Sequence, residues 1–185
     1  MPGMDDPMAA VVAMLTRPAE EPTSVREGAG GWTARTGGHV PARAETIRAV
    51  KERRRGDLAM VAVEYVDVEE REWQGWFGAK RVDGAWRAAG GSMGSGANPP
   101  RSSAPWANFG SAWGQDLFMA GGRVHGEGVA RVRVLSAAGG AVEDSVDDGI
   151  ALVMEPGPFP RPWTVELYDA AGALVGSHPY PRRPA

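Results

Sequence analysis

The chain has 185 residues, of which 43% are hydrophobic and 23% are charged, and its net charge is only −3. This composition is that of an ordinary globular protein, and so small a charge provides no field that would attract nucleic acid or an anionic membrane. The absence of cysteine excludes disulfides, thiolate metal sites and thiol nucleophiles. The acidic N-terminus lacks the polarity of a secretory signal, so we expect a cytoplasmic protein without a membrane segment.

Residues 1–38 are predicted to form a helix followed by a flexible linker. Asp6 and Pro7 are typical of a helix start, and Val11 and Leu15 then recur at helical spacing. Beyond residue 17 the sequence is rich in Pro, Glu, Thr and Gly and shows no periodicity, which predicts a loop.

Residues 39–90 are predicted to form an antiparallel meander. The stretch 58–68 has the alternation and the β-branched residues of a strand, and 73–80 predicts a second strand. Asp83 and Gly84 then form a strong two-residue hairpin signal that leads into a third strand. Residues 44–50 fit a helix as well as a strand, and we favour a strand.

The basic cluster Lys51, Arg53, Arg54 and Arg55 follows this segment. No aromatic residue interleaves with the cluster and acidic residues flank it, so we expect a solvated turn rather than a phosphate-binding surface.

The stretch from Gly90 to Gly94 matches the G-x-S-x-G nucleophile elbow around Ser92. That motif requires a helix immediately after the serine, and the Gly- and Pro-rich sequence that follows cannot form one. We therefore predict that Ser92 is not a nucleophile.

Residues 91–122 are predicted to be a loop, because Gly and Pro disfavour regular structure. The aromatic residues Trp106, Phe109 and Trp113 within this segment are expected to cover an apolar surface.

Residues 123–179 are predicted to form one half of a small Ig-like or barrel-like antiparallel β-sandwich, and 180–185 a disordered tail. In the stretch 124–135, Val132 and Val134 alternate with polar residues and are expected to be buried, as are Val165 and Leu167. The whole chain is therefore predicted to be mainly β, of the α+β class, with a short N-terminal helix.

Two groups of residues were considered as metal sites. The acids Glu143, Asp144, Asp147 and Asp148 lack the spacing of a calcium loop, and a turn explains them more simply. His125 and Glu127 are two apart on a strand, but nothing fixes a third ligand. We expect neither a metal nor another cofactor.

The predicted binding surface combines the aromatic segment with the polar face of the stretch 124–135. Its members are Trp106, Phe109, Trp113, His125, Glu127, Arg131 and Arg133. Aromatic and Arg side chains are the usual anchors of binding sites. The alternative is a small-molecule pocket lined by Trp73, Trp76 and Trp86, of which Trp76 and Trp86 could be cross-strand neighbours.

Two resemblances accompany these predictions. The stretch 58–89, with MVAVEYVD and WFGAKRVDGAW, resembles the sheet of the NTF2-like (SnoaL-like) cone fold, which implies a Trp-lined pocket but no transferable catalytic residue. The C-terminal half, with PWANFG, GGRVHGEGVARVRV, VEDSVDDGIAL and VELYDAAGALVG, resembles uncharacterised proteins of actinomycetes. Its strand pattern is similar to Ig-like or prealbumin-like sandwiches, which serve mostly as interaction modules.

The leading functional hypothesis is a non-enzymatic binding or protein-interaction protein. The alternative is an NTF2-like small-molecule-binding protein or a cyclase- or isomerase-type enzyme. Its partner would be a protein or a small molecule rather than nucleic acid or a membrane. A filled core with exposed aromatic residues on a strand edge would favour the binding protein.

Overall fold

The computed structural model describes residues 5–18, 24–27, 33–36, 40–94, 104–113 and 117–180. In these residues the chain is mainly β, with a single α-helix, α1 (Pro7–Leu15), and a 3-10 turn at Ala44–Thr46. No helix among them is long and apolar enough to cross a membrane.

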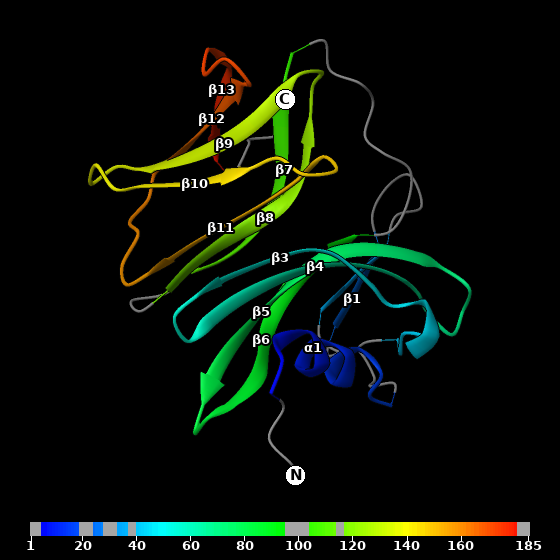
Figure 1. Ribbon diagram of the computed structural model, residues 1–185. Coiled ribbons are helices and arrows are strands. Elements are labelled where there is room, and N and C mark those ends of the chain that lie inside the picture. The colour runs from blue at the N-terminus through cyan, green and yellow to red at the C-terminus, as the bar shows by residue number, and fades with distance from the viewer. Residues whose placement is uncertain are drawn as a thin grey trace.

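Three antiparallel sheets and α1 are stacked in four layers (Figure 1). The helix-backed sheet contains, in order, β3 (Arg48–Arg55), β4 (Leu58–Val66), β5 (Glu72–Val82) and β6 (Ala85–Gly94). The middle sheet has the order β11 (Ile150–Pro156), β8 (Leu117–His125) and β7 (Trp106–Trp113). The outer sheet has the order β10 (Ala141–Ser145), β9 (Val129–Ser136), β12 (Trp163–Asp169) and β13 (Leu174–Tyr180).

The predicted helix forms as its sequence indicates. Asp6 is the N-cap and its carboxylate accepts a hydrogen bond from the backbone N–H of Ala9, while Pro7 occupies the first turn. Val11 and Leu15 are buried against the helix-backed sheet. This packing stabilises a helix that would be too short to form alone in water.

Strand β4 is buried on both faces, which explains its uninterrupted apolar sequence. Met60 and Ala62 face the middle sheet, while Val61 and Val63 face α1. The meander and the hairpin at Asp83 and Gly84 are confirmed, because β3, β4, β5 and β6 pair in sequence order.

The middle sheet also contributes to two cores. Phe118 of β8 belongs to the core shared with the outer sheet, whereas the next residue, Met119, packs on the helix-backed sheet. On β11, Val153 likewise belongs to the core shared with the outer sheet, and Leu152 packs on the helix-backed sheet. The middle and outer sheets therefore form the predicted sandwich, which the helix-backed sheet covers on one side.

The sandwich core is rich in aromatic rings. The ring of Phe118 lies 4.5 Å from that of Phe159 and 4.7 Å from that of Trp163, measured between centroids. Val132, Val134, Val165 and Leu167 are fully buried, as their alternation predicts. The facing prediction for β9 and β12 is confirmed.

The predicted loop at 91–122 is wrong for the described residues, since β6 extends to Gly94 and β7 and β8 follow. Glycines occur here because neighbouring strands and sheets approach closely. A Cβ atom on Gly121 would lie 2.6 Å from Cδ2 of Leu152, and one on Gly91 would lie 2.6 Å from Cδ1 of Phe77. At these positions glycine permits close packing rather than irregular backbone.

Two further expectations about loops need correction. The predicted linker after residue 17 contains a two-stranded hairpin of β1 (Ser24–Glu27) and β2 (Thr33–Thr36). The predicted tail begins too early, because Tyr180 belongs to β13, is buried, and donates a hydrogen bond of 3.0 Å from its hydroxyl to the carbonyl of Phe109. The rest of the predicted tail lies outside the described residues.

Candidate functional site

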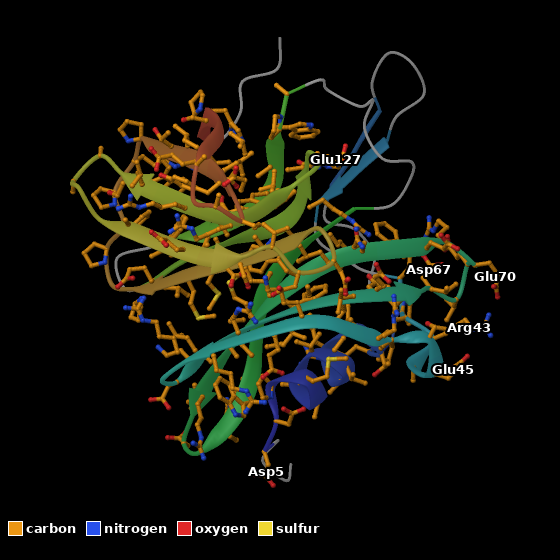
Figure 2. The ribbon with its side chains drawn as sticks, turned by 45° about the horizontal axis from the view of Figure 1, so that its top comes forward. Asp5, Arg43, Glu45, Asp67, Glu70 and Glu127 are labelled. Carbon is orange, nitrogen blue, oxygen red and sulfur yellow. The ribbon has the colours of Figure 1, made fainter. Side chains whose placement is uncertain are left out.

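The structure divides the predicted binding surface between two sheets. The stretch 124–135 is not one strand: the chain turns at Gly126 and Gly128, whose φ angles of 128° and 76° favour glycine. His125 consequently ends β8 in the middle sheet, whereas Arg131 lies on β9 in the outer sheet. Glu127 is exposed in the turn between them (Figure 2). The prediction that these residues share a face is therefore wrong.

Trp106 and His125 do lie together. They are partners in the β7–β8 register, and their rings stack with centroids 4.5 Å apart and an interplanar angle of 19°. Burial and the nearby Arg123 guanidinium lower the pKa of His125 below its ordinary value. Arg123, on the same strand face, donates a 2.5 Å hydrogen bond to Gln74 of the helix-backed sheet, so this end of the middle sheet is tied down by polar contacts.

The other two aromatic members of the predicted surface are not available as anchors there. Phe109 is buried in the sandwich core. Trp113 ends β7, and its side chain lies outside the described residues. The aromatic segment is thus a strand of the sandwich rather than a covering loop.

The three tryptophans of the alternative pocket point into separate packing clusters. Trp76 is buried between the helix-backed and middle sheets, whereas Trp86 is buried on the opposite face, beside Ala10 of α1. Trp73 stacks near Tyr65 and donates a 2.8 Å hydrogen bond to Asp67. The predicted cross-strand pair is wrong, because Trp76 lies opposite Ser92. The three side chains do not line a common site.

Ser92 lies within β6, at a ladder position opposite Trp76. A nucleophile elbow places its serine on a sharp turn between a strand and a helix, with the hydroxyl exposed at the top of the sheet. A serine inside an antiparallel ladder has neither feature.

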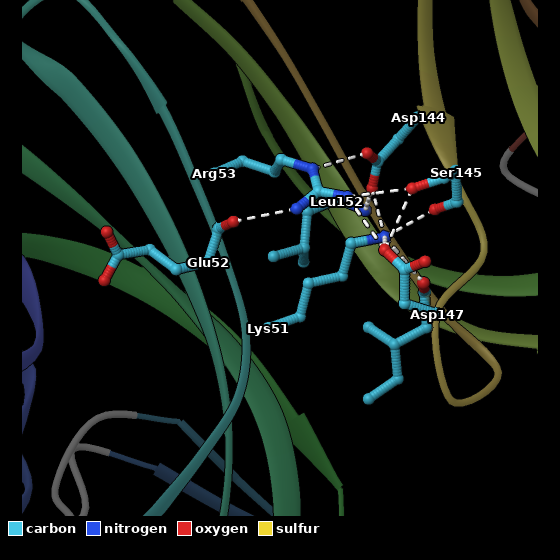
Figure 3. A network of polar contacts seen from close by, with 8 residues as sticks. Lys51, Glu52, Arg53, Asp144, Ser145, Asp147 and Leu152 are labelled. Carbon is cyan, nitrogen blue, oxygen red and sulfur yellow. Dashed lines mark hydrogen bonds and ion pairs between the residues drawn. The ribbon is translucent and has the colours of Figure 1, made fainter.

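Four residues form an ionic clasp between the helix-backed sheet and the sandwich: Lys51, Arg53, Asp144 and Asp147 (Figure 3). The Lys51 side chain is only 3% exposed, and its Nζ lies 2.6 Å from Asp144 Oδ2 and 3.1 Å from Asp147 Oδ2. It also donates a 3.0 Å hydrogen bond to the carbonyl of Ile150. The basic cluster is therefore not a solvated turn: it lies on β3, and its members Lys51 and Arg53 pack against β10 and the turn after it. Arg54 pairs with Asp6 and Arg55 with Glu155 of β11.

Arg53 completes the ionic clasp. Its Nε lies 2.6 Å from Asp144 Oδ1 and its Nη2 lies 2.9 Å from Asp147 Oδ2. Partial burial opposes its charge, but the hydrogen bonds to these carboxylates outweigh that effect and raise the pKa of Arg53. Hydrogen bonds from Lys51 and Ser145 lower the pKa of Asp147.

Three of the four acidic residues named as possible calcium ligands, Glu143, Asp144 and Asp147, thus have protein cations as partners. Asp144 also accepts a 2.7 Å hydrogen bond from the backbone of Leu152, so its two oxygens are fully engaged. Among the described residues, no three His, Asp or Glu side chains are placed to hold a metal ion. The four basic and acidic members of the clasp were visible in the sequence, but no sequence signal pairs residues 91 positions apart, as Arg53 and Asp144 are.

The outer sheet presents a polar face to solvent. Arg131 lies 2.6 Å and Arg133 3.2 Å from the carboxylate of Glu143 on the adjacent β10. The Arg131 guanidinium also lies over the ring of Tyr168, 4.5 Å from its centroid, and Tyr168 donates a 2.6 Å hydrogen bond to Glu166. These side chains hold one another in place above β9, β10 and β12.

Exposed apolar residues continue this face at its edge. Tyr168 lies opposite Arg131 on one side and opposite Leu174 of β13 on the other, so the three form a row across the sheet. Leu174 is 55% exposed and its neighbour Val175 is 37% exposed. Only two other large hydrophobic side chains among the described residues are exposed, Val68 and Met93, and they lie in the helix-backed part of the chain. We call Arg131, Tyr168, Leu174 and Val175 the outer-sheet patch.

The comparisons with known proteins found no family model, no curated protein and no solved structure that matches this chain.

Proposed function

We propose that this chain is a protein-interaction protein, rather than an enzyme, and that it binds its partner through the outer-sheet patch. The observation that carries the proposal is the row of Arg131, Tyr168 and Leu174 across three strands of the outer sheet, in which Arg131 and Tyr168 are partly buried and Leu174 is exposed. Two of the predicted surface residues, Arg131 and Arg133, lie on this face; Trp106 and His125 lie elsewhere.

The composition of the patch suits a protein interface. Tyr and Arg are enriched among the residues that contribute most binding energy, particularly beside exposed apolar groups. Tyr168 is held from two sides, by the guanidinium of Arg131 and by its hydrogen bond to Glu166. Such a preorganised side chain loses little conformational entropy when a partner binds.

The electrostatics of this face favour a protein over nucleic acid. Arg131 and Arg133 both pair with Glu143, and a second carboxylate, Glu166, lies opposite Arg133, so the two arginines are matched by two acids and leave no surplus charge for a phosphate backbone. Phosphate recognition depends on a surplus of positive charge, and the whole chain carries a net charge of −3.

The test uses a random peptide library displayed on phage, selected on the intact chain, followed by titration of each selected peptide. Tyr168→Ala and Leu174→Ser should each weaken binding by about tenfold or more, as removal of a central interface residue does. Val68→Ser removes an apolar side chain of equal exposure (56%) outside the patch and should leave the affinity unchanged. If the patch variants bind as tightly as the parent chain, or if no peptide is selected, the proposal is wrong.

A further inference from the structure

Strand β13 is an edge of the outer sheet. It pairs with β12 on one side and with no other strand of the described chain. At an edge, every second residue directs its backbone N–H and C=O away from the sheet, where an added strand can pair with them. The outer-sheet patch lies directly beside this open edge.

We infer that the partner is an extended peptide segment that adds to β13 as a fifth strand of the outer sheet. This inference rests on the proposed function and specifies how the patch would be used. In such strand addition, main-chain hydrogen bonds supply affinity, and side chains on one face of the added strand supply specificity.

Before Pro179, the sequence of β13 lacks the charged residues that usually protect an edge, although a β-bulge interrupts its pairing with β12 beside Leu174. Natural edge strands carry charged residues that discourage pairing. The opposite edge of the same sheet, β10, has Glu143 and Asp144, and the edge strand β3 has Lys51 and four arginines that are engaged in ionic contacts. β13, with the sequence LVGSHPY, has no Asp, Glu, Lys or Arg and begins with exposed Leu174 and Val175.

The length of the open edge sets the size of the occupant. Pro179 has no N–H to offer, and Tyr180 is buried under the end of the sandwich. The pairing window is therefore 174–178, which is about 17 Å of strand. Stable dimers bury roughly 1,200–2,000 Å² in total, far more than a strand pair of this length supplies. The window fits a short peptide segment better than a second copy of the chain.

The side chains beside the window indicate the chemistry of the peptide. Tyr168 and Leu174 form an apolar pair that would contact an aliphatic or aromatic residue. In the next row, Glu166 lies opposite Ser177 on one side and opposite Arg133 on the other; Arg133 pairs with Glu143, and Glu166 makes no ion pair among the described residues. Ser177 is small, so a long basic side chain can pass over it to reach Glu166. The peptide should therefore carry an apolar residue beside Leu174 and a Lys or Arg beside Ser177, in the next row of the same face.

The test uses the peptides selected above, together with analogues that are N-methylated at single backbone positions. Hydrogen exchange should show that amides within 174–178 become protected when the peptide binds. N-methylation at alternate positions should weaken binding by about tenfold or more, because each removes a ladder hydrogen bond and adds a clash. Glu166→Gln should remove the preference for a basic residue, while Thr164→Val, on the same strand face, should retain it.

The outcomes separate the two proposals. If Tyr168→Ala abolishes binding but N-methylation has no effect and the 174–178 amides stay unprotected, the patch binds its partner without strand addition, and this inference is wrong while the proposed function stands. If Tyr168→Ala has no effect, both fail. If native mass spectrometry shows a dimer whose 174–178 amides are protected without peptide, the occupant is a second copy, which also overturns the inference.

Discussion

In the sandwich core, Phe118, Phe159 and Trp163 pack ring against ring within a cluster of apolar residues. At the seam between the helix-backed sheet and the sandwich, an apolar cluster around Met60 and Leu152 is bordered by the buried ammonium of Lys51 and its two carboxylates. The first contact depends mainly on apolar area, which has no direction. The second depends on the position of individual atoms.

The difference concerns specificity as much as stability. Apolar surfaces tolerate small shifts in register, whereas a buried cation costs several kcal/mol unless each proton meets an acceptor. Lys51 finds its acceptors only when β3 lies against the turn after β10. We interpret the ionic clasp as the device that fixes where the helix-backed sheet docks. If this interpretation is correct, the sandwich core should depend on apolar burial and the seam on the position of individual charges.

Val134→Asp should unfold the chain. Val134 is fully buried in the sandwich core, and an unpaired carboxylate there costs an amount comparable to the whole free energy of unfolding, about 5–15 kcal/mol. Arg133→Ala, the matched change one residue away on the exposed face, should cost less than about 1 kcal/mol. Circular dichroism and urea titration would measure both. Equal destabilisation would contradict the facing of β9.

Lys51→Met should destabilise the chain by about 3–5 kcal/mol, because it leaves the buried Asp144 and its neighbour with one cation fewer. Arg48→Met is the control, since it breaks an ion pair with Glu64 in which the Arg48 side chain is 73% exposed, and such pairs contribute about 1 kcal/mol or less. Urea unfolding of both variants gives the comparison. If the two variants lose the same free energy of unfolding, the ionic clasp does not stabilise the contact between the helix-backed sheet and the sandwich.

Gly110→Ala should cost about 1–3 kcal/mol, the range for overpacking. A Cβ atom at Gly110 would overlap the Oγ and Cβ atoms of Ser92 on β6. The double variant Gly110→Ala with Ser92→Gly removes the obstacle and should recover most of the loss. Stability measured for the two single variants and the double variant forms a complete cycle. Purely additive effects would show that the two residues do not touch.

Alternation was enough to predict the sandwich strands and the burial of Val132, Val134, Val165 and Leu167, because one face of each strand is buried and the other is solvated. The helix was predictable from its cap and spacing. The strand alternation, the helix cap and the helical spacing each involve residues that are close in sequence, and each is observed in the structure.

The errors arose where distant segments meet. Glycines that allow close packing, such as Gly110 and Gly121, have the same sequence appearance as glycines in loops. The division of the stretch 124–135 between two sheets depends on the turn at Gly126 and Gly128, which the alternation around it concealed. The ionic clasp joins β3 to residues more than 90 positions later, so its charges appeared solvent-exposed. Of the proposed patch, only Arg131 was among the predicted site residues.

The smallest effect should come from His125, at the edge of the seam. Burial and the Arg123 guanidinium lower its pKa in the folded chain, so the unfolded chain, with a histidine pKa of about 6.5, binds the proton first as the pH falls. His125 therefore contributes stability that is present above about pH 6.5 and is lost as the pH falls towards its lower folded pKa. His125→Phe keeps a ring to stack on Trp106 and removes the titrating group. Between pH 7.5 and 5.5, the urea midpoint of the parent chain should fall more than that of His125→Phe. The lowered pKa of Asp147 keeps that carboxylate of the ionic clasp ionised throughout this window. An equal fall of the urea midpoint in both proteins would show that protonation of His125 does not change the stability between pH 7.5 and 5.5.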